Sequence, residues 1–136
     1  MDPAQALADL TEISSQIQAA VLADESGAVI ASTFADAGRA ERAARVAAEL
    51  LRAAEGAGRP GLVQLEAATQ LGSVFVVRDG GRLVAALTGA SPTAGLIFYD
   101  LKTTLRLAAD EPKAKAAKPA ARRRKKETEE GDGEGP

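Results

Sequence analysis

The stretch Gly72-Ser-Val-Phe-Val-Val-Arg-Asp-Gly-Gly-Arg-Leu-Val-Ala-Ala-Leu-Thr-Gly89 decides the fold. Two runs rich in β-branched and apolar residues flank Gly80 and Gly81, a pair that tolerates the positive φ angles of a two-residue hairpin turn. The stretch therefore predicts a β-hairpin closed by Asp79 and Arg82.

Both faces of this hairpin are apolar. Because side chains alternate along a strand, one face carries Phe75, Val77, Val84 and Ala86, and the other carries Val74, Val76, Leu83, Ala85 and Leu87. A sheet with one wet face would instead alternate apolar with polar residues. We therefore expect the hairpin to lie in the middle of a sheet, with a cover on each side.

The composition narrows the class of protein. The chain has 136 residues, of which 46% are hydrophobic and 26% charged, as in one ordinary soluble domain. No run approaches the roughly 18 to 20 apolar residues of a membrane-spanning helix, and the start Met-Asp-Pro-Ala-Gln lacks the basic residues of a secretory signal. We expect a cytoplasmic protein.

The chain contains neither Cys nor His. Their absence excludes disulfides, thiol nucleophiles, zinc–thiolate sites and the usual general base at neutral pH. We therefore expect no enzyme, no metal and no cofactor.

The N-terminal third predicts a helix and a hairpin. Asp2 suits the N-cap and Pro3 the first turn, and the apolar stripe that follows is Leu7, Leu10, Ile13 and Ile17. Residues 19–23 and 28–32 then form two strands around the turn Asp24-Glu25-Ser26-Gly27. Asp24 and Glu25 resemble cation ligands, but an EF-hand needs oxygen ligands at several further positions, so turn chemistry is the preferred interpretation.

Residues 36–55 predict the second helix, which Gly56 ends. Its core stripe is Ala40, Ala43, Ala44, Ala47, Leu50, Leu51 and Ala54, and Val46, Ala48 and Ala53 widen the apolar surface. Two interpretations remain open: the helix covers its own sheet and also meets a partner, or alanine is present only as a good helix former.

The link Gly56-Ala57-Gly58-Arg59-Pro60-Gly61 matches the dinucleotide-binding fingerprint. That fingerprint works between a strand and a helix, whereas this link follows a helix, so we interpret it as a loop. Residues 62–70 then alternate as a third strand that contains no Lys or Pro to protect an edge. Such an edge favours pairing with a second copy of the chain.

A third helix follows the central hairpin. Ser91 and Pro92 predict its start, its core stripe is Ala94, Ile97, Phe98, Leu101, Leu105 and Ala108, and it ends near Asp110. This places a folded domain at residues 1–110.

Residues 111–136 predict a disordered charged tail. Its basic patch is Arg122, Arg123, Arg124, Lys125 and Lys126, followed by an acidic block at 127–134. The patch could bind nucleic acid, anionic lipid or an acidic protein surface, but the neighbouring acidic block favours self-neutralisation. Residues 1–109 carry 9 basic and 12 acidic side chains, which gives the body no general attraction for nucleic acid.

The predicted fold class is α+β: a single five-stranded antiparallel sheet with helices on both faces, in the order α-β-β-α-β-β-β-α. With this order the chain resembles the roadblock/dynein light chain family. The segments that carry the resemblance are Val21 to Ala31, Gly72 to Leu87, and Gly95-Leu96-Ile97 leading into Asp100-Leu101. Profilin-like and longin-like proteins share this general architecture.

The resemblance implies a homodimer in which the second helices pack together and the third strands pair. The interface residues it suggests are Ala43, Val46, Ala47, Leu50, Val63 and Leu65. Prokaryotic relatives resemble non-catalytic regulators or scaffolds of small Ras-like GTPases, some of them GTPase-activating. Arg42, Arg45 and Arg52 are candidates for contacting such a partner, although plain surface charge is the preferred interpretation, because nothing in the sequence holds one of them toward a site.

Two other functions stay open at the level of sequence. The chain could be an interaction platform, independent of nucleotide, in a signalling complex with a sensor kinase. It could also associate with nucleic acid through the basic patch of the tail, although the shortage of aromatic residues for base stacking weakens that alternative.

Overall fold

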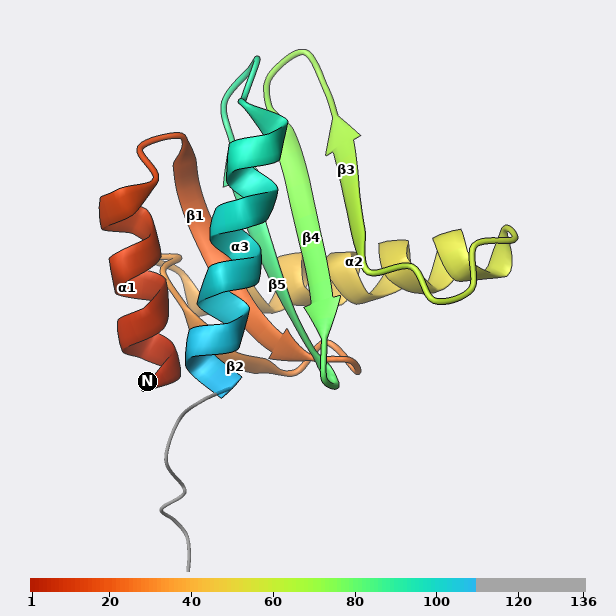
Figure 1. Ribbon diagram of the computed structural model, residues 1–136, viewed down its shortest axis with the longest axis horizontal. Coiled ribbons are helices and arrows are strands. Elements are labelled where there is room, and N and C mark those ends of the chain that lie inside the picture. The colour runs from red at the N-terminus through yellow and green to blue at the C-terminus, as the bar shows by residue number, and fades with distance from the viewer. Residues whose placement is uncertain (110–136) are drawn as a thin grey trace, which may run out of the picture.

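The computed structural model describes residues 1–109 (Figure 1). Its elements are α1 (Pro3–Ile13), β1 (Ile17–Asp24), β2 (Val29–Ser32), α2 (Ala37–Gly56), β3 (Gln64–Ala68), β4 (Ser73–Asp79), β5 (Arg82–Thr88) and α3 (Ala94–Ala109). This is the predicted order of helices and strands. The predicted tail and its basic patch lie outside the described residues.

One antiparallel sheet with the strand order β2-β1-β5-β4-β3 organises the chain. The predicted hairpin is β4–β5, and it lies inside the sheet between β1 and β3. Gly80 and Gly81 have φ angles of 61° and 83°, the two positive values that a type I′ turn requires. The prediction for the hairpin is confirmed.

Helices cover both faces of the sheet, in two separate cores. α1 and α3 lie side by side on one face (Figure 1), where Phe75 and Val84 pack against Leu7 and Ile97. On the other face α2 covers a second core of Val21, Ala23, Val76, Leu83 and Ala85. The predicted division of the hairpin residues between the two faces is confirmed. Each fully buried Leu, Val or Phe stabilises the fold by roughly 1.5–3 kcal/mol relative to exposure.

The first helix is shorter than its apolar spacing suggested. Asp2 caps it as predicted, since its carboxylate accepts a hydrogen bond of 3.1 Å from the Gln5 N–H. Ile13, however, is 74% exposed, and Ile17 belongs to β1. The prediction that Ile13 and Ile17 belong to the apolar stripe of the helix was wrong. An apolar residue four positions after Ile13 fits a continuing helix, but it fits the start of a strand equally well.

The turn between β1 and β2 uses the Asp24 carboxylate for its own closure. One oxygen, Oδ1, accepts hydrogen bonds from the Ser26 N–H, the Ser26 hydroxyl and the Ala28 N–H, at 2.9, 2.6 and 3.1 Å. The Ser26 hydroxyl and the Ala28 N–H hold the pKa of Asp24 below its usual value. These bonds confirm the turn interpretation.

α3 begins two residues later than predicted, at Ala94 in place of Pro92. Ser91 adopts a positive φ of 58°, and the first helical hydrogen bond runs from the Ile97 N–H to the Thr93 carbonyl, at 3.1 Å. Ser91 in the left-handed region and Pro92 with its fixed φ therefore form the turn that precedes the helix. Among residues 1–109 no helix is long and apolar enough to cross a membrane.

The link after α2 is a loop, as predicted. Gly58 and Gly61 have φ angles of 102° and 76°, and the next element is β3. Because no helix begins at the link, it lacks the helix N-terminus that would receive a pyrophosphate.

The turn from β3 to β4 depends on Gly72. A Cβ at this position would lie 2.1 Å from the Thr88 carbonyl oxygen, which belongs to the backbone of β5. Gly72→Ala is therefore expected to destabilise the fold by about 2 kcal/mol or more. This corresponds to a fall in Tm of roughly 10 °C in thermal unfolding followed by circular dichroism.

The matched control is Gly95→Ala, in the exposed first turn of α3, where an added Cβ meets no atom within 4 Å. Alanine is the better helix former, so its Tm should be equal to that of the wild type or slightly higher. Equal Tm values for the two variants would contradict the packing at Gly72.

Candidate functional site

α2 leaves part of its side of the sheet uncovered. It packs mainly over β1, β2 and β5, and its C-terminal end projects past β3, the edge strand (Figure 1). The small side chains of Ala40, Ala44, Ala47 and Ala48 are buried against the strands. One helix therefore covers one half of this face, and the half beside β3 remains open.

Apolar side chains lie on this open half. Val46 of α2 is 48% exposed, and Ala43, Leu65 and Val74 are only partly buried at the border of the second core. We call the group Ala43, Val46, Leu50, Leu65, Val74 and Leu87 the α2 surface. It combines a helix side with the free edge of a sheet, two features from which protein–protein interfaces are built.

The predicted interface residues divide into three groups. Ala43, Val46, Leu50 and Leu65 belong to the α2 surface. Ala47 is fully buried in the second core, so it supports this surface from behind and is not available to a partner. Val63 is 56% exposed just before β3 and borders a different hollow, beside α3. Sequence periodicity did not separate Ala47 from Val46, because adjacent helix positions both carried small apolar residues.

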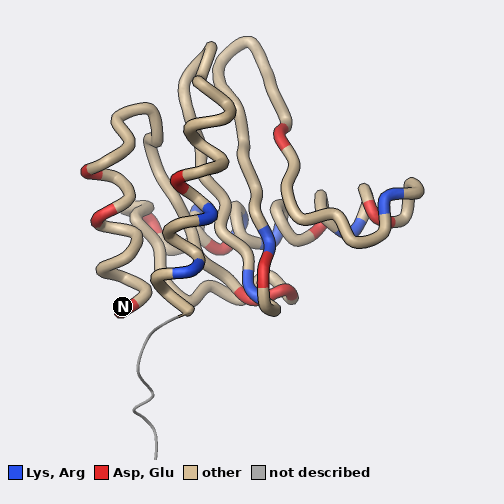
Figure 2. The backbone as a smooth tube through the Cα atoms, in the orientation of Figure 1, with Lys and Arg blue, Asp and Glu red and all other residues tan. Residues whose placement is uncertain are grey.

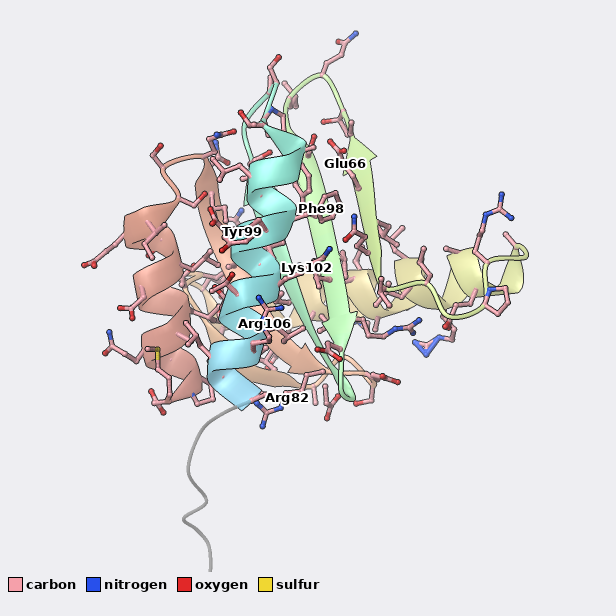
Figure 3. All side chains as sticks on the ribbon, viewed as in Figure 1. Glu66, Arg82, Phe98, Tyr99, Lys102 and Arg106 are labelled. Atoms are coloured by element: carbon pink, nitrogen blue, oxygen red, sulfur yellow. The ribbon has the colours of Figure 1, made fainter. Side chains whose placement is uncertain are left out.

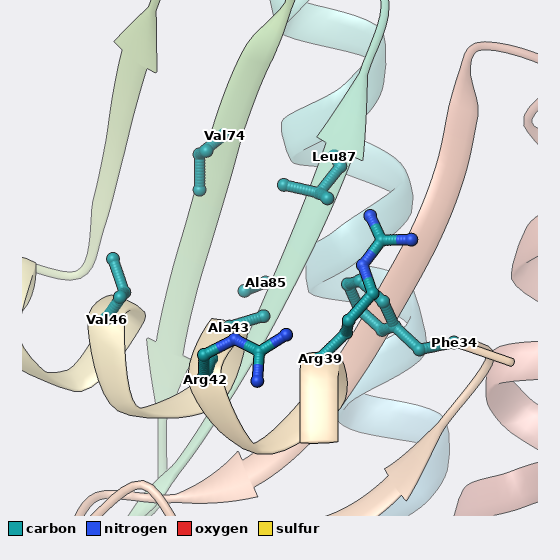
Figure 4. A pocket seen from close by; sticks show the side chains of 8 residues that line it. All are labelled: Phe34, Arg39, Arg42, Ala43, Val46, Val74, Ala85 and Leu87. Atoms are coloured by element: carbon teal, nitrogen blue, oxygen red, sulfur yellow. The ribbon is translucent and has the colours of Figure 1, made fainter. Parts of the chain in front are cut away.

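A hollow of about 380 Å³ lies within the α2 surface (Figure 4). Its apolar lining comes from Phe34, Ala43, Val46, Val74, Ala85 and Leu87. Arg39 and Arg42 border it, and the Arg39 guanidinium carbon lies 5.8 Å from the centre of the Phe34 ring, within cation–π range. The hollow therefore suits a partner that presents an apolar group next to an acidic one.

The three predicted partner-binding arginines do not form one cluster. Arg42 borders the hollow with Arg39, whereas Arg52 borders a smaller hollow with Glu25, Glu55 and Arg78. Arg45 is exposed; its Cα lies 3.2 Å from where a Cβ on Gly27 would stand, so this part of α2 lies against the β1–β2 turn. Arg39 was not among the predicted partner-binding residues, although its position one turn before Arg42 was a usable signal.

An ion pair ties the projecting end of α2 to the sheet. Arg78 of β4 donates a hydrogen bond of 2.5 Å to the Glu55 carboxylate, and the same nitrogen donates to the Leu62 carbonyl in the link before β3. The hydrogen bond from Arg78 holds the pKa of Glu55 below its usual value. One guanidinium thus fixes the position of α2 relative to the edge strand.

The described residues offer contact surfaces and little chemistry. Within residues 1–109 no group of three carboxylates gathers as a metal site would require. The Ser14 hydroxyl is buried without a hydrogen-bond partner, and the chain has no His to activate a serine.

Comparison with solved structures identifies the fold as that of roadblock/LC7 domains. A roadblock/LC7 domain from Streptomyces avermitilis matches 80% of this chain and 96% of its own, with a TM-score of 0.73 and 22% identity. MglB from Myxococcus xanthus matches 79% and 92%, with a TM-score of 0.65 and 16% identity. Profilin IA from Acanthamoeba castellanii matches 78% and 96%, with a TM-score of 0.55 and 10% identity. No protein-family model and no curated protein sequence matches.

The ion pair between Arg78 and Glu55 predicts a pH-dependent stability. Since the folded-state pKa of Glu55 is lowered from 4.5, the pair stabilises the fold above pH 4.5, and this contribution is lost as the pH falls through the lowered pKa. Glu55→Gln should therefore have a lower Tm than the wild type at pH 7. The difference in Tm between the wild type and Glu55→Gln should become smaller as the pH falls below 4.5.

Glu49→Gln is the control. Glu49 is an exposed carboxylate on the same helix, and it has no ion pair among residues 1–109. Its Tm should follow that of the wild type at each pH. A Tm gap for Glu55→Gln that does not change with pH would refute the assigned role of the ion pair.

Proposed function

We propose that the chain is a non-catalytic, homodimeric regulator or scaffold of a small Ras-like GTPase in the cytoplasm. The observation that carries the proposal is the α2 surface: a partly uncovered apolar helix side beside a free strand edge, in a chain without His or Cys. We assign dimerisation and partner binding to residues 1–110.

The proposed dimer joins two copies through α2 and β3. Val46 and Leu50 of one copy pack against the same residues of its partner, while the two β3 edges pair antiparallel into one continuous sheet. Strand pairing satisfies the unpaired N–H and C=O groups of β3, and helix packing covers the apolar side chains that α2 presents. The roadblock fold supports the proposal, as does the assembly of a protein with this fold, an MglB described with a tetrameric arrangement, which matches 79% of this chain at 16% identity.

The proposed GTPase site lies on the same side of the molecule. Arg39 and Arg42 border the hollow without a carboxylate within salt-bridge distance among residues 1–109, so their charges are available to an acidic partner surface. We assign these arginines, with Arg45 and Arg52 further along α2, to contact and orientation of the GTPase. The chemistry of hydrolysis stays with the GTPase.

Val46→Lys is expected to convert the dimer to a monomer, because two buried ammonium groups would meet at the helix contact. Light scattering after size-exclusion chromatography measures the mass. The circular dichroism spectrum should stay that of the wild type, because the side chain is already 48% exposed within one copy.

Leu96→Lys is the matched control for this experiment. Leu96 is 49% exposed on α3, on the opposite side of the sheet, so the dimer mass should not change. A dimeric Val46→Lys variant, or a monomeric Leu96→Lys variant, would argue against the α2 interface.

Arg42→Glu is expected to reduce capture of a small GTPase from cytoplasmic extract by about tenfold, since charge reversal turns attraction into repulsion. Immobilised wild type and variant are compared in the presence of GTP and of GDP, with mass spectrometry of the retained proteins. The wild type should retain a small GTPase in one nucleotide state. Arg106→Glu, on the opposite side of the molecule, should retain it equally well.

Two outcomes would reject this part of the proposal. Retention of a kinase or another signalling protein, indifferent to nucleotide, would favour an interaction platform. Equal loss of the GTPase with Arg42→Glu and Arg106→Glu would show that net charge, not the α2 surface, governs capture.

A further inference from the structure

A second accessible surface lies on the other side of the sheet, between α3 and β3. A hollow of about 220 Å³ opens there, bordered by Val63, Val77, Leu105, Lys102 and Arg106 among others. Val77 and Leu105 are buried, whereas Val63 is 56% exposed. Figure 3 shows Lys102 and Arg106 along the outward side of α3. We call this region the α3–β3 surface.

Two cations of this surface, Lys102 and Arg106, have no ion-pair partner within the described chain, whereas Arg78, which also borders the hollow, is paired with Glu55. Among residues 1–109 the one ion pair joins Arg78 and Glu55, so neither Lys102 nor Arg106 has a carboxylate within 4.0 Å. Arg82 adds a third cation near the end of α3, where its guanidinium lies 3.5 Å from the Ala108 carbonyl. Figure 2 shows Lys and Arg positions along α3 and near the β4–β5 turn, where Asp and Glu positions lie beside them.

Two carboxylates limit the size of the positive patch. Asp79 borders the hollow, and Glu66 lies on the same face of β3, opposite Phe75 of β4. A local excess of positive charge remains, although the body of the chain has more acidic than basic residues. The patch is therefore a local feature and not a consequence of net charge.

We propose that the α3–β3 surface binds an acidic amphipathic segment of a partner protein. An aliphatic side chain of the segment enters the hollow beside Val63, and its carboxylates face Lys102 and Arg106. These two cations lie four residues apart on α3 and therefore on one side of the helix, so carboxylates one helical turn apart would match them. Tyr99, 65% exposed one turn earlier, extends the contact with an amphipathic ring.

The geometry favours a protein over a nucleic acid or a membrane. Three cations are fewer than the 6–10 phosphate contacts of typical DNA-binding proteins, and Asp79 and Glu66 would repel a phosphate chain that extends beyond them. An aliphatic hollow also gives no platform for base stacking. The acidic excess of the body opposes an anionic lipid surface.

The proposal does not rest on the proposed dimer or on a GTPase. Both surfaces adjoin β3, but α3 and α2 belong to separate cores on opposite faces of the sheet, so the side chains of α3 that the segment contacts are not those of the proposed helix contact. If the experiments reject the proposed dimer or GTPase contact, the proposal for the α3–β3 surface still stands, and the reverse also holds. The two sets of experiments can therefore be interpreted separately.

The test uses the full chain and a short fluorescein-labelled synthetic peptide built from Glu and Leu at helical spacing. Fluorescence anisotropy is expected to report saturable binding. The double variant Lys102→Glu/Arg106→Glu should weaken it by about tenfold, because two favourable surface ion pairs become two repulsive ones. A peptide with Ala in place of Leu should also bind more weakly, since it lacks the anchor for the hollow.

The matched protein control is Arg42→Glu/Arg45→Glu, the same charge change on the part of α2 that does not border Arg78, which should leave the affinity for the peptide within about twofold of the wild type. Amide shift changes in two-dimensional NMR spectra should centre on Val63, Tyr99, Lys102 and Arg106. A peptide with Lys in place of Glu should not bind.

Four results would overturn the proposal. They are no saturable binding, equal weakening by the two double variants, shift changes confined to the α2 surface, and binding that appears only when Glu127, Glu129 and Glu130 are replaced by Gln. The last result would identify the acidic block of the chain itself as the occupant.

Discussion

The hairpin β4–β5 must be buried on both of its faces, and the rest of the structure depends on that constraint. Phe75 and Val76 are consecutive, both are fully buried, and they enter two different cores. A sheet buried on both sides needs a layer of helices on each. Residues 1–109 supply two helices for one face and one for the other. The partly uncovered apolar side chains near β3 follow from this unequal cover.

The alanines of α2 explain how a single helix serves as a cover. Ala44 and Ala47 are fully buried, and small side chains at the contact let the helix lie close to the strands with little loss of side-chain entropy. The surplus apolar surface comes from other residues, Val46 and Leu50, which point away from that contact. The inner alanines therefore pack α2 onto its own sheet and are more than good helix formers. Contact of Val46 and Leu50 with a partner, the other part of the first interpretation, stays a proposal.

The features of the fold that depend on the spacing of neighbouring residues could be predicted from the sequence. The hairpin, its turn, the two faces and the Asp2 cap all follow from spacing within a few residues, and the structure has them. Ile17 and the start of α3 were misplaced, because an apolar residue or a Ser-Pro pair fits a helix or its flanking turn equally well. The ion pair Arg78–Glu55 joins residues 23 positions apart, and Phe34 reaches the hollow from a loop. Only the fold brings such residues together, so no pattern in the sequence could identify them.

The ion pair Arg78–Glu55 connects the fold to the candidate α2 interface. It holds the projecting end of α2, and through the Leu62 carbonyl it also holds the link to β3. The helix side and the strand edge therefore keep a fixed relation to each other, which a partner must match if it contacts both. The pair is only partly buried, with side-chain exposures of 16% and 34%. A partner that excluded water there would strengthen the Coulomb attraction, so binding and the geometry of the α2 surface would reinforce each other.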